Sequence, residues 1–137
     1  MIQTKTGAFV SADTSLFNKA IQNEKVDALF FDANNDTWPD LYVVSGGNDQ
    51  KDGSQELADH LYINDGKGHF TEPANAIPAL LKNKSCVSTA DVDKDGDLDL
   101  FVGVLADALK YGIAQSSYLL INDSKGNFSL ARKQTIN

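Results

Sequence analysis

The chain has 137 residues, of which 42 % are hydrophobic, so it is long and apolar enough for one domain with a packed core, residues 1–137. Its 12 basic and 19 acidic residues give a net charge of −7, and the basic residues are scattered, which excludes nucleic acid as an expected partner. No apolar run reaches the length of a membrane-spanning helix, and residues 2–7 lack the apolar segment of a signal peptide. We therefore expect no membrane insertion and no export signal in this stretch.

In chain order, the first expected element is a β-strand at about residues 6–10, followed by a short helical stretch at 14–22. Short runs rich in β-branched and aromatic residues then predict four strands, at about 26–31, 41–45, 60–64 and 68–72. After a second short helical stretch at 74–82, four further strands are predicted at about 85–90, 98–104, 117–122 and 126–131. The pattern indicates an all-β protein.

Two blocks of sequence recur at nearly the same spacing, which indicates an internal repeat. Residues 31–44 align with residues 90–103 at an offset of 59, and residues 61–70 align with residues 119–128 at an offset of 58. The chain therefore divides into the terminal strand of a preceding unit at 6–10, a first repeat at 11–72 and a second repeat at 73–132.

An acidic loop after the first strand of the second repeat carries the strongest chemical signal. Positions one, three, five and nine of this loop are Asp91, Asp93, Asp95 and Asp99. Carboxylates at alternate positions of a tight loop converge on one point, and Ca²⁺ prefers a cage of several such oxygens. We predict that these four side chains bind Ca²⁺, while Asp97 at position seven adds its backbone oxygen and directs its side chain to solvent.

Two other structures would explain such a loop. An EF-hand needs a glutamate at position twelve and flanking helices, but that position is Val102 here and Val43 in the first repeat, and strand-like sequence follows both. A solvated acidic turn without metal is the remaining alternative. Crowded aspartates repel one another unless a cation lies among them, which favours the calcium loop.

The matching loop of the first repeat keeps oxygen donors at the same four positions, with the backbone oxygen of Trp38 at position seven. These four donors are Asp32, Asn34, Asp36 and Asp40. Asn34 removes one charge, and Thr37 stands where the second repeat has Gly96, a place that suits a positive φ angle. We therefore predict one Ca²⁺ per repeat, bound more weakly in the first loop.

The remaining motifs suggest no catalytic constellation, and we expect no enzymatic activity. His60 and His69 have no histidine counterparts in the second repeat, and they form no recognisable triad or zinc set. The glycine-containing segments at 64–68 and 122–126 are expected to be turns between third and fourth strands. They are not expected to bind phosphate, because no helix follows either segment.

Three further expectations concern packing and surface. Trp38 is expected to pack between the two units, with an exposed sugar-stacking ring as the alternative. Cys86 is expected to be a small buried hydrophobic residue. The connections at about 46–59 and 105–116 are where we expect a partner surface, because long loops on a rigid sheet are common binding sites.

The acidic loop, the following Leu-x-Leu-Phe-Val strand and the Asn-Asp-Gly-Lys-Gly-x-Phe hairpin together resemble the FG-GAP or VCBS repeat of integrin-α-like β-propellers. Residues 45–48 and 111–120 look similar to bacterial proteins in which such repeats precede an ASPIC/UnbV domain. The resemblance implies two four-stranded antiparallel blades plus one extra N-terminal strand, a partial β-propeller.

The same resemblance implies calcium held between the first and second strands of each blade, and a role in adhesion that involves a protein or carbohydrate ligand. It also suggests a secreted or cell-surface location. The alternative is a fragment of a propeller enzyme of the polysaccharide lyase or hydrolase type. Propellers close with about four to eight blades, so we expect this pair of blades to form a homo-oligomer or to be part of a longer propeller.

Overall fold

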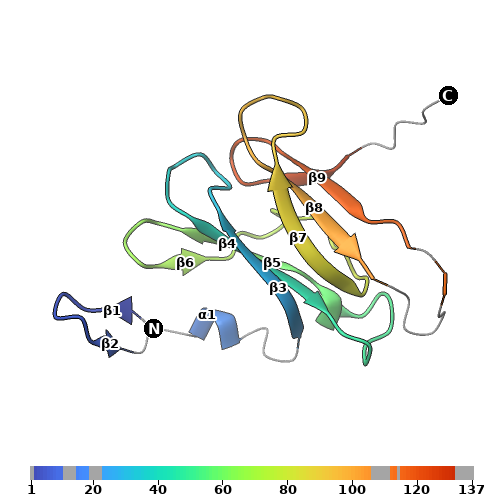
Figure 1. Ribbon diagram of the computed structural model, residues 1–137, viewed down its shortest axis with the longest axis horizontal. Coiled ribbons are helices and arrows are strands. Elements are labelled where there is room, and N and C mark those ends of the chain that lie inside the picture. Colours follow the sequence, from blue (N-terminus) through green and yellow to red (C-terminus); the bar gives the residue numbers. More distant parts are fainter. Residues whose placement is uncertain (1, 11–14, 19–22, 106–111, 114, 132–137) are drawn as a thin grey trace.

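The computed structural model describes residues 2–10, 15–18, 23–105, 112–113 and 115–131 (Figure 1). Parts of the predicted helical stretch at 14–22 and of the predicted partner-binding loop at 105–116 lie outside these ranges. None of the helices in the described ranges is long and apolar enough to cross a membrane.

The main part of the structure consists of two four-stranded antiparallel blades that follow one another in the chain. Blade 1 has the order β3-β4-β5-β6, and its strands are Glu24–Phe31, Asp40–Gly46, His60–Asn64 and Phe70–Thr71. Blade 2 has the order β7-β8-β9-β10, and its strands are Lys84–Ala90, Asp99–Val104, Tyr118–Asn122 and Phe128–Leu130. The predicted all-β class and the two blades of a partial propeller are confirmed.

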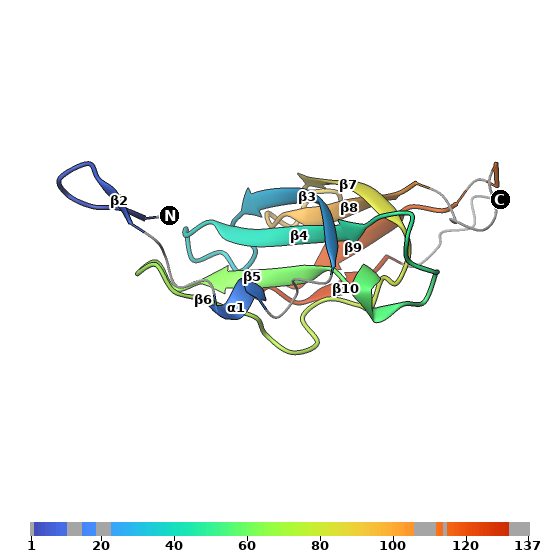
Figure 2. The ribbon, with the colours of Figure 1, turned by 90° about the horizontal axis from the view of Figure 1, so that it is seen from below.

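A single parallel contact between Gly46 of β4 and Lys84 of β7 joins the two blades into one curled sheet, seen from a second side in Figure 2. No side chain fits at Gly46, because a Cβ there would lie 2.3 Å from the carbonyl oxygen of Lys84. Glycine at this position therefore allows the backbones of the two blades to approach each other.

The N-terminal segment differs in detail from the predicted extra strand. Within residues 6–10 only β2 (Phe9–Val10) is a strand, and it pairs with β1 (Ile2–Gln3) rather than with a blade. This hairpin lies at one end of the molecule, apart from both blades (Figure 1). The short helix α1 (Ser15–Asn18) follows it and places Phe17 against Tyr62, with ring centroids 4.8 Å apart.

The connection between β6 and β7 does not form the short helix expected at 74–82. It consists of turns and extended chain, since Pro73 and Pro78 lack the backbone donors that a helix uses. Ala76 of this connection nevertheless reaches the core, and its carbonyl accepts a hydrogen bond from the Phe128 amide at 2.7 Å. The connection between the blades therefore supports the outer strand of blade 2. The other short helical element, the 3₁₀ turn η1 (Gln55–Leu57), precedes β5.

The hydrophobic core lies between the two blades. Tyr42 and Leu61 of blade 1 and Leu100 and Leu120 of blade 2 are each at most 2 % exposed. The aromatic rings of Phe31 and Phe128 meet across the same space, with centroids 6.1 Å apart. Because both blades bury one sheet face against the other, each repeat depends on its neighbour for its core.

A buried ion pair fastens the start of blade 2 to blade 1. The Lys84 ammonium lies 3.3 Å from Oδ1 of Asp59, and neither side chain is exposed to solvent. Lys84 also donates to the carbonyl oxygens of Leu57, Leu80 and Lys82. Burial lowers the pKa of Lys84 and raises the pKa of Asp59, and in each case the charge of the other group opposes the shift.

We predict that Lys84→Met lowers the free energy of unfolding by about 3–5 kcal/mol, because Asp59 would stay buried without its cation. Urea denaturation measures this loss. The matched control is Lys25→Met at the equivalent position of β3, where the side chain is exposed and donates to Ser45 at 3.3 Å. The control is expected to cost less than about 1 kcal/mol, and equal losses in the two variants would contradict the assignment.

Candidate metal centre

The loop between β7 and β8 brings three carboxylates together. One oxygen from each of Asp91, Asp93 and Asp99 lies within 4.8 Å of the others. Asp91 and Asp93 are exposed, whereas Asp99 is buried at the start of β8. The loop therefore lies between the first and second strands of the blade, as predicted, and three of its four predicted side-chain donors converge.

The backbone of this loop is shaped by its own side chains. Asp91 Oδ2 accepts a hydrogen bond from the Gly96 amide at 3.2 Å, and Asp95 Oδ1 accepts one from the Asp97 amide at 3.1 Å. Lys94 and Gly96 adopt positive φ angles of 65° and 96°. Desolvation within the loop, together with the charge of Asp95, raises the pKa of Asp93. Crowding of the carboxylates is therefore a property of the folded loop.

Asp99 has a structural role in addition to its place in the cluster. Its Oδ2 accepts a hydrogen bond from the Val92 amide at 2.9 Å, and its Oδ1 accepts one from the Asn122 amide at 2.9 Å. One carboxylate thus ties the start of the loop to the end of β9. We name this residue, and Asp40 in the first repeat, the latch aspartates.

Asp40 makes the same two bonds in blade 1. Its Oδ2 accepts from the Ala33 amide and its Oδ1 from the Asn64 amide, both at 2.8 Å. Burial raises the pKa of Asp40, and these two hydrogen bonds oppose that effect. Because the arrangement recurs in both repeats, it belongs to the repeat itself.

The first loop differs from the second in how its side chains are engaged. Asn34 donates from its amide to Asp36 Oδ2 at 2.9 Å, and Asp32 accepts from the Asp36 and Thr37 amides at 3.1 Å and 2.7 Å. Within the described residues, this loop brings no set of three carboxylate oxygens together as the second loop does. Thr37 has a φ angle of 74°, which confirms that this position requires a positive φ in both repeats.

The expectation that the Asp97 side chain points to solvent is wrong. Asp97 is 2 % exposed, and its Oδ2 accepts a hydrogen bond from the Ser124 hydroxyl at 2.7 Å. Its Oδ1 has no donor within the described part of the chain. Burial raises the pKa of the Asp97 carboxyl, against the opposing bond from Ser124. The side chain at position seven therefore binds the hairpin that joins β9 to β10.

Trp38 occupies the same position in the first loop and also contacts the hairpin of its own blade. Its ring lies over Gly66, where a Cβ would be only 2.3 Å from the ring atom Cε2. Trp38 is 49 % exposed, so the predicted packing between blades is replaced by packing within blade 1. Gly66 aligns with Ser124. Position seven of the loop therefore contacts the hairpin in both repeats, through the Trp38 ring in the first repeat and through the hydrogen bond of Asp97 in the second.

The two hairpins are turns, as predicted. Asp65 Oδ1 accepts hydrogen bonds from the Lys67 and His69 amides, and Asp123 Oδ1 accepts the equivalent pair in blade 2. Gly66 and Ser124 have φ angles of 71° and 64°. The aspartate side chains therefore hold both turns in shape.

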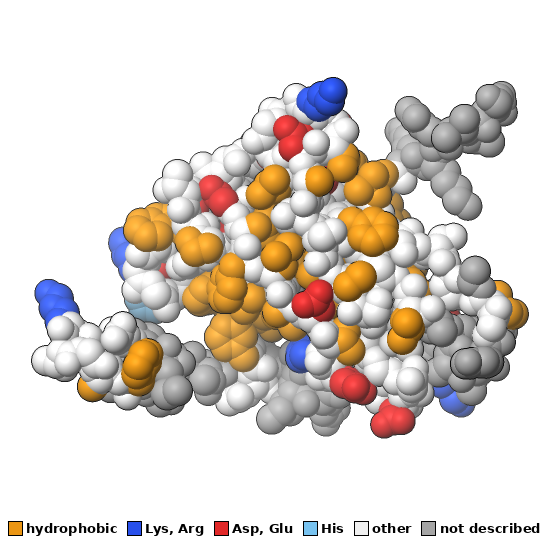
Figure 3. Space-filling view, in the orientation of Figure 1, with side chains coloured by type: hydrophobic (Ala, Val, Ile, Leu, Met, Phe, Trp, Pro, Cys, Tyr) orange, Lys and Arg blue, Asp and Glu red, His pale blue; other side chains and the backbone are white. Residues whose placement is uncertain are grey.

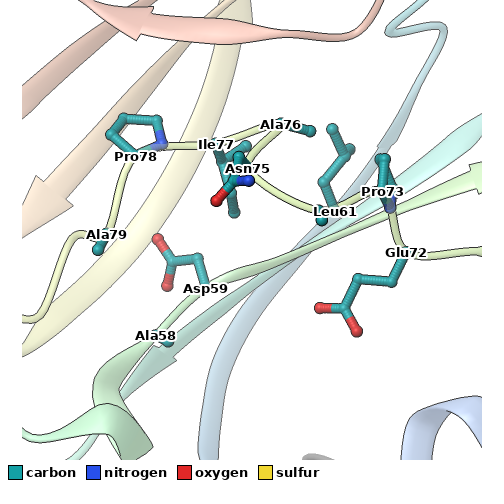
Figure 4. Close-up of a pocket in the computed structure, with 11 residues that line it drawn as sticks. Ala58, Asp59, Leu61, Glu72, Pro73, Asn75, Ala76, Ile77, Pro78 and Ala79 are labelled. Carbon is teal, nitrogen blue, oxygen red and sulfur yellow. The ribbon is translucent and has the colours of Figure 1, made fainter.

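A cavity of about 360 Å³ lies between β5 and the connection to blade 2, with Asp59 and Glu72 on its wall (Figure 4). Both acids are engaged by protein groups. Asp59 accepts hydrogen bonds from Tyr42 Oη and the Ser45 amide, both at 2.8 Å, in addition to its contact with Lys84. Glu72 lies 2.6 Å from Nδ1 of His60. The acids of the cavity are thus occupied in holding the fold.

Cys86 is exposed on β7 rather than buried, which corrects the expectation from its apolar surroundings in the sequence. Its neighbour across the pair is Gly103, where a Cβ would lie 2.5 Å from the Cys86 sulfur. Cys86 therefore packs against Gly103 of the neighbouring strand. It is exposed to solvent on the face of blade 2 that does not contact blade 1.

Comparison with known proteins gives one family match. A family model described as an FG-GAP-like repeat matches residues 32–102, which is more than half of the chain. The match runs from the first loop to β8 and so includes both acidic loops. No curated protein and no solved structure gives a significant match. The closer likeness to VCBS proteins with an ASPIC/UnbV domain stays a prediction.

The contact between Trp38 and the hairpin predicts that Gly66→Ala costs at least about 1 kcal/mol more stability than Gly68→Ala. Both glycines have positive φ angles, 71° and 92°, but no atom lies within 4 Å of a Cβ built at Gly68. Chemical denaturation of both variants measures the difference. Adding Trp38→Ala should remove the excess cost, and an excess that persists would show that the collision is not its cause.

Proposed function

Since the chain belongs to the family of FG-GAP-like repeat proteins, we propose that it is a calcium-binding, propeller-type repeat module with an adhesive or ligand-binding role. One observation carries the calcium part of this proposal. It is the convergence of carboxylate oxygens from Asp91, Asp93 and Asp99 within 4.8 Å of one another.

The donor set of the second loop fits Ca²⁺ well. Every candidate donor is an oxygen, the class of ligand that Ca²⁺ takes in proteins. The unpartnered, buried Oδ1 of Asp97 adds negative charge beside the loop. Asp91, Asp93, Asp95 and Asp99 would hold the ion by their side chains, with the Asp97 carbonyl as a fifth donor. The ion would offset the repulsion among these carboxylates and so stabilise the blade.

In the first loop, Asp32, Asn34, Asp36 and Asp40 would hold a second ion, together with the carbonyl of Trp38. We propose that this site is the weaker one, for two reasons. Asn34 contributes no charge and already donates to Asp36, and Thr37 holds a positive φ angle that costs a β-branched residue conformational energy. We expect both features to lower the affinity of the first loop for Ca²⁺.

We place the adhesive role outside cells, where calcium-binding modules work with dissociation constants of about 10⁻⁴–10⁻³ M. The partner would be a protein or a carbohydrate. The half-exposed ring of Trp38 and the polar residues at 46–54 are the surfaces on which we place it. A non-catalytic role is supported by the engagement of Asp59, Glu72 and His60 in the fold.

We predict that about 10 mM Ca²⁺ stabilises the protein by about 1.4–2.7 kcal/mol per occupied loop, if its dissociation constants lie in the range for extracellular modules. Thermal melting with calcium and with excess chelator measures this gain. Asp93→Asn should remove most of the gain, whereas Asp49→Asn, an exposed aspartate outside both loops, should leave it unchanged.

Titration calorimetry on the same variants tests the order of the two sites. We expect two binding events of unequal affinity in the unmodified protein and only the weaker event in Asp93→Asn. Identical melting curves with and without chelator would contradict the proposal of bound calcium. Two equal affinities would contradict the proposed difference between the loops.

A further inference from the structure

The hairpin that joins β9 to β10 in blade 2 contacts both acidic loops. We name its residues, 122–128, the bridging hairpin (Figure 1). Toward the second loop, the Ser124 hydroxyl donates to Asp97 Oδ2 at 2.7 Å, and the Asn122 amide donates to Asp99 Oδ1 at 2.9 Å. Positions seven and nine of the second loop are therefore both attached to this hairpin.

The other side of the bridging hairpin contacts the first loop, which belongs to blade 1. The Asn122 side chain donates from Nδ2 to the Ala33 carbonyl at 2.8 Å. Gly126 is buried against the same loop, since a Cβ built there would lie 3.6 Å from the Cβ of Asn34. Positions two and three of the first loop therefore rest on a segment that positions seven and nine of the second loop hold.

The equivalent hairpin of blade 1, residues 64–70, makes no such connection within the described part of the chain. Asn64 donates from Nδ2 to the Pro39 carbonyl of its own blade at 3.0 Å. Gly66 stands where the bridging hairpin has Ser124, and it meets the neutral ring of Trp38 rather than a carboxylate. The connection from one loop to the other therefore runs through blade 2, and its charged link is the bond from Ser124 to position seven.

This link ends on a carboxylate whose charge has little compensation. Asp97 is 2 % exposed, and its Oδ1 has no donor among the described residues. Its charge adds to those of Asp95 and Asp99, two positions away on either side. Acidic side chains also show at the surface over both loops (Figure 3). Repulsion within the second loop therefore acts on the group that holds the bridging hairpin.

We propose that the bridging hairpin couples the two loops, so that Ca²⁺ bound in the second loop raises the affinity of the first loop. The inference rests on the calcium binding proposed above. With a cation in the second loop, Asp97 is relieved of repulsion and holds Ser124 more firmly. The hairpin then keeps Ala33 and Asn34 in place before an ion enters the first loop, so binding there costs less ordering.

The sign of the coupling distinguishes this route from a direct effect of charge. Two divalent cations repel each other, so a purely electrostatic effect lowers the affinity of the loop that fills last. A neutral substitution in the hairpin leaves that repulsion unchanged. Coupling through Ser124 raises the affinity instead, and it is lost when this hydroxyl alone is removed.

The test uses Ser124→Gly, which removes the hydroxyl and changes no charge. Ser124 has a φ angle of 64°, which glycine adopts readily, so the turn should keep its shape. In titration calorimetry with Ca²⁺, the stronger event should stay unchanged, because the second loop fills while the first is empty. The weaker event should weaken about fivefold, the lower end of typical couplings between sites. Ser129→Ala, which removes an exposed hydroxyl from β10, should change neither event.

A second background tests whether the coupling needs the ion. In Asp93→Asn the second loop is not filled, so the first loop binds without help from its neighbour. Adding Ser124→Gly to this variant should weaken the remaining event by less than about twofold, compared with about fivefold in the unmodified chain. The difference between the two backgrounds measures the coupling itself.

Four results would overturn the coupling. A loss on the stronger event, alone or as large as on the weaker one, would show that Ser124 serves the second loop itself. An equal loss in both backgrounds would show that the hairpin supports the first loop whether or not the second is filled. Two events that Ser124→Gly leaves unchanged, or a single event in the unmodified chain, would contradict the coupling but not calcium binding. Absence of any binding event would instead contradict the proposed function.

Discussion

Each repeat is organised by one buried carboxylate. Asp40 in blade 1 and Asp99 in blade 2 accept two backbone hydrogen bonds each, one from the start of the acidic loop and one from the end of the third strand. A charged acceptor makes such bonds about twice as strong as neutral ones. Without it, two backbone amides in each blade, one buried and one partly buried, would lose their partner. The latch aspartates thus determine where the loop lies relative to the sheet.

The acidic loop, the third strand and the outer hairpin of each blade are therefore held in fixed positions relative to one another by side-chain contacts. Position nine closes the loop onto the third strand, and position seven reaches the hairpin, through Asp97 and Ser124 in one repeat and through Trp38 and Gly66 in the other. Positions one, three and five are left on the outside, where their carboxylates repel one another. An ion bound there would stabilise a loop that the rest of the blade already holds.

Much of this architecture could be predicted from the sequence, because it depends on local patterns that occur twice. The repeat, the strands, the place of the acidic loops and the positive φ angle shared by Thr37 and Gly96 follow from spacing and residue type. Other features depend on residues distant in the chain. The Asp97 carboxylate can be buried because the hydroxyl of Ser124, 27 residues later, donates a hydrogen bond to it. The Lys84 side chain can be buried because it forms an ion pair with Asp59 of the other blade. Cys86 is exposed because it lies on the uncovered face of blade 2, and the sequence alone carries no sign of which face is covered.

The central claim is that the aspartate at position nine supports the fold even without metal. Its most direct test is the free energy of unfolding of Asp99→Asn, measured by urea denaturation in excess chelator. The replacement turns a charged acceptor of two backbone bonds into a neutral group, so the account predicts a loss of about 2–3 kcal/mol relative to the unmodified protein. Equal or greater stability of Asp99→Asn under chelation would contradict the account, since it is the result expected of a residue whose sole role is to hold a cation.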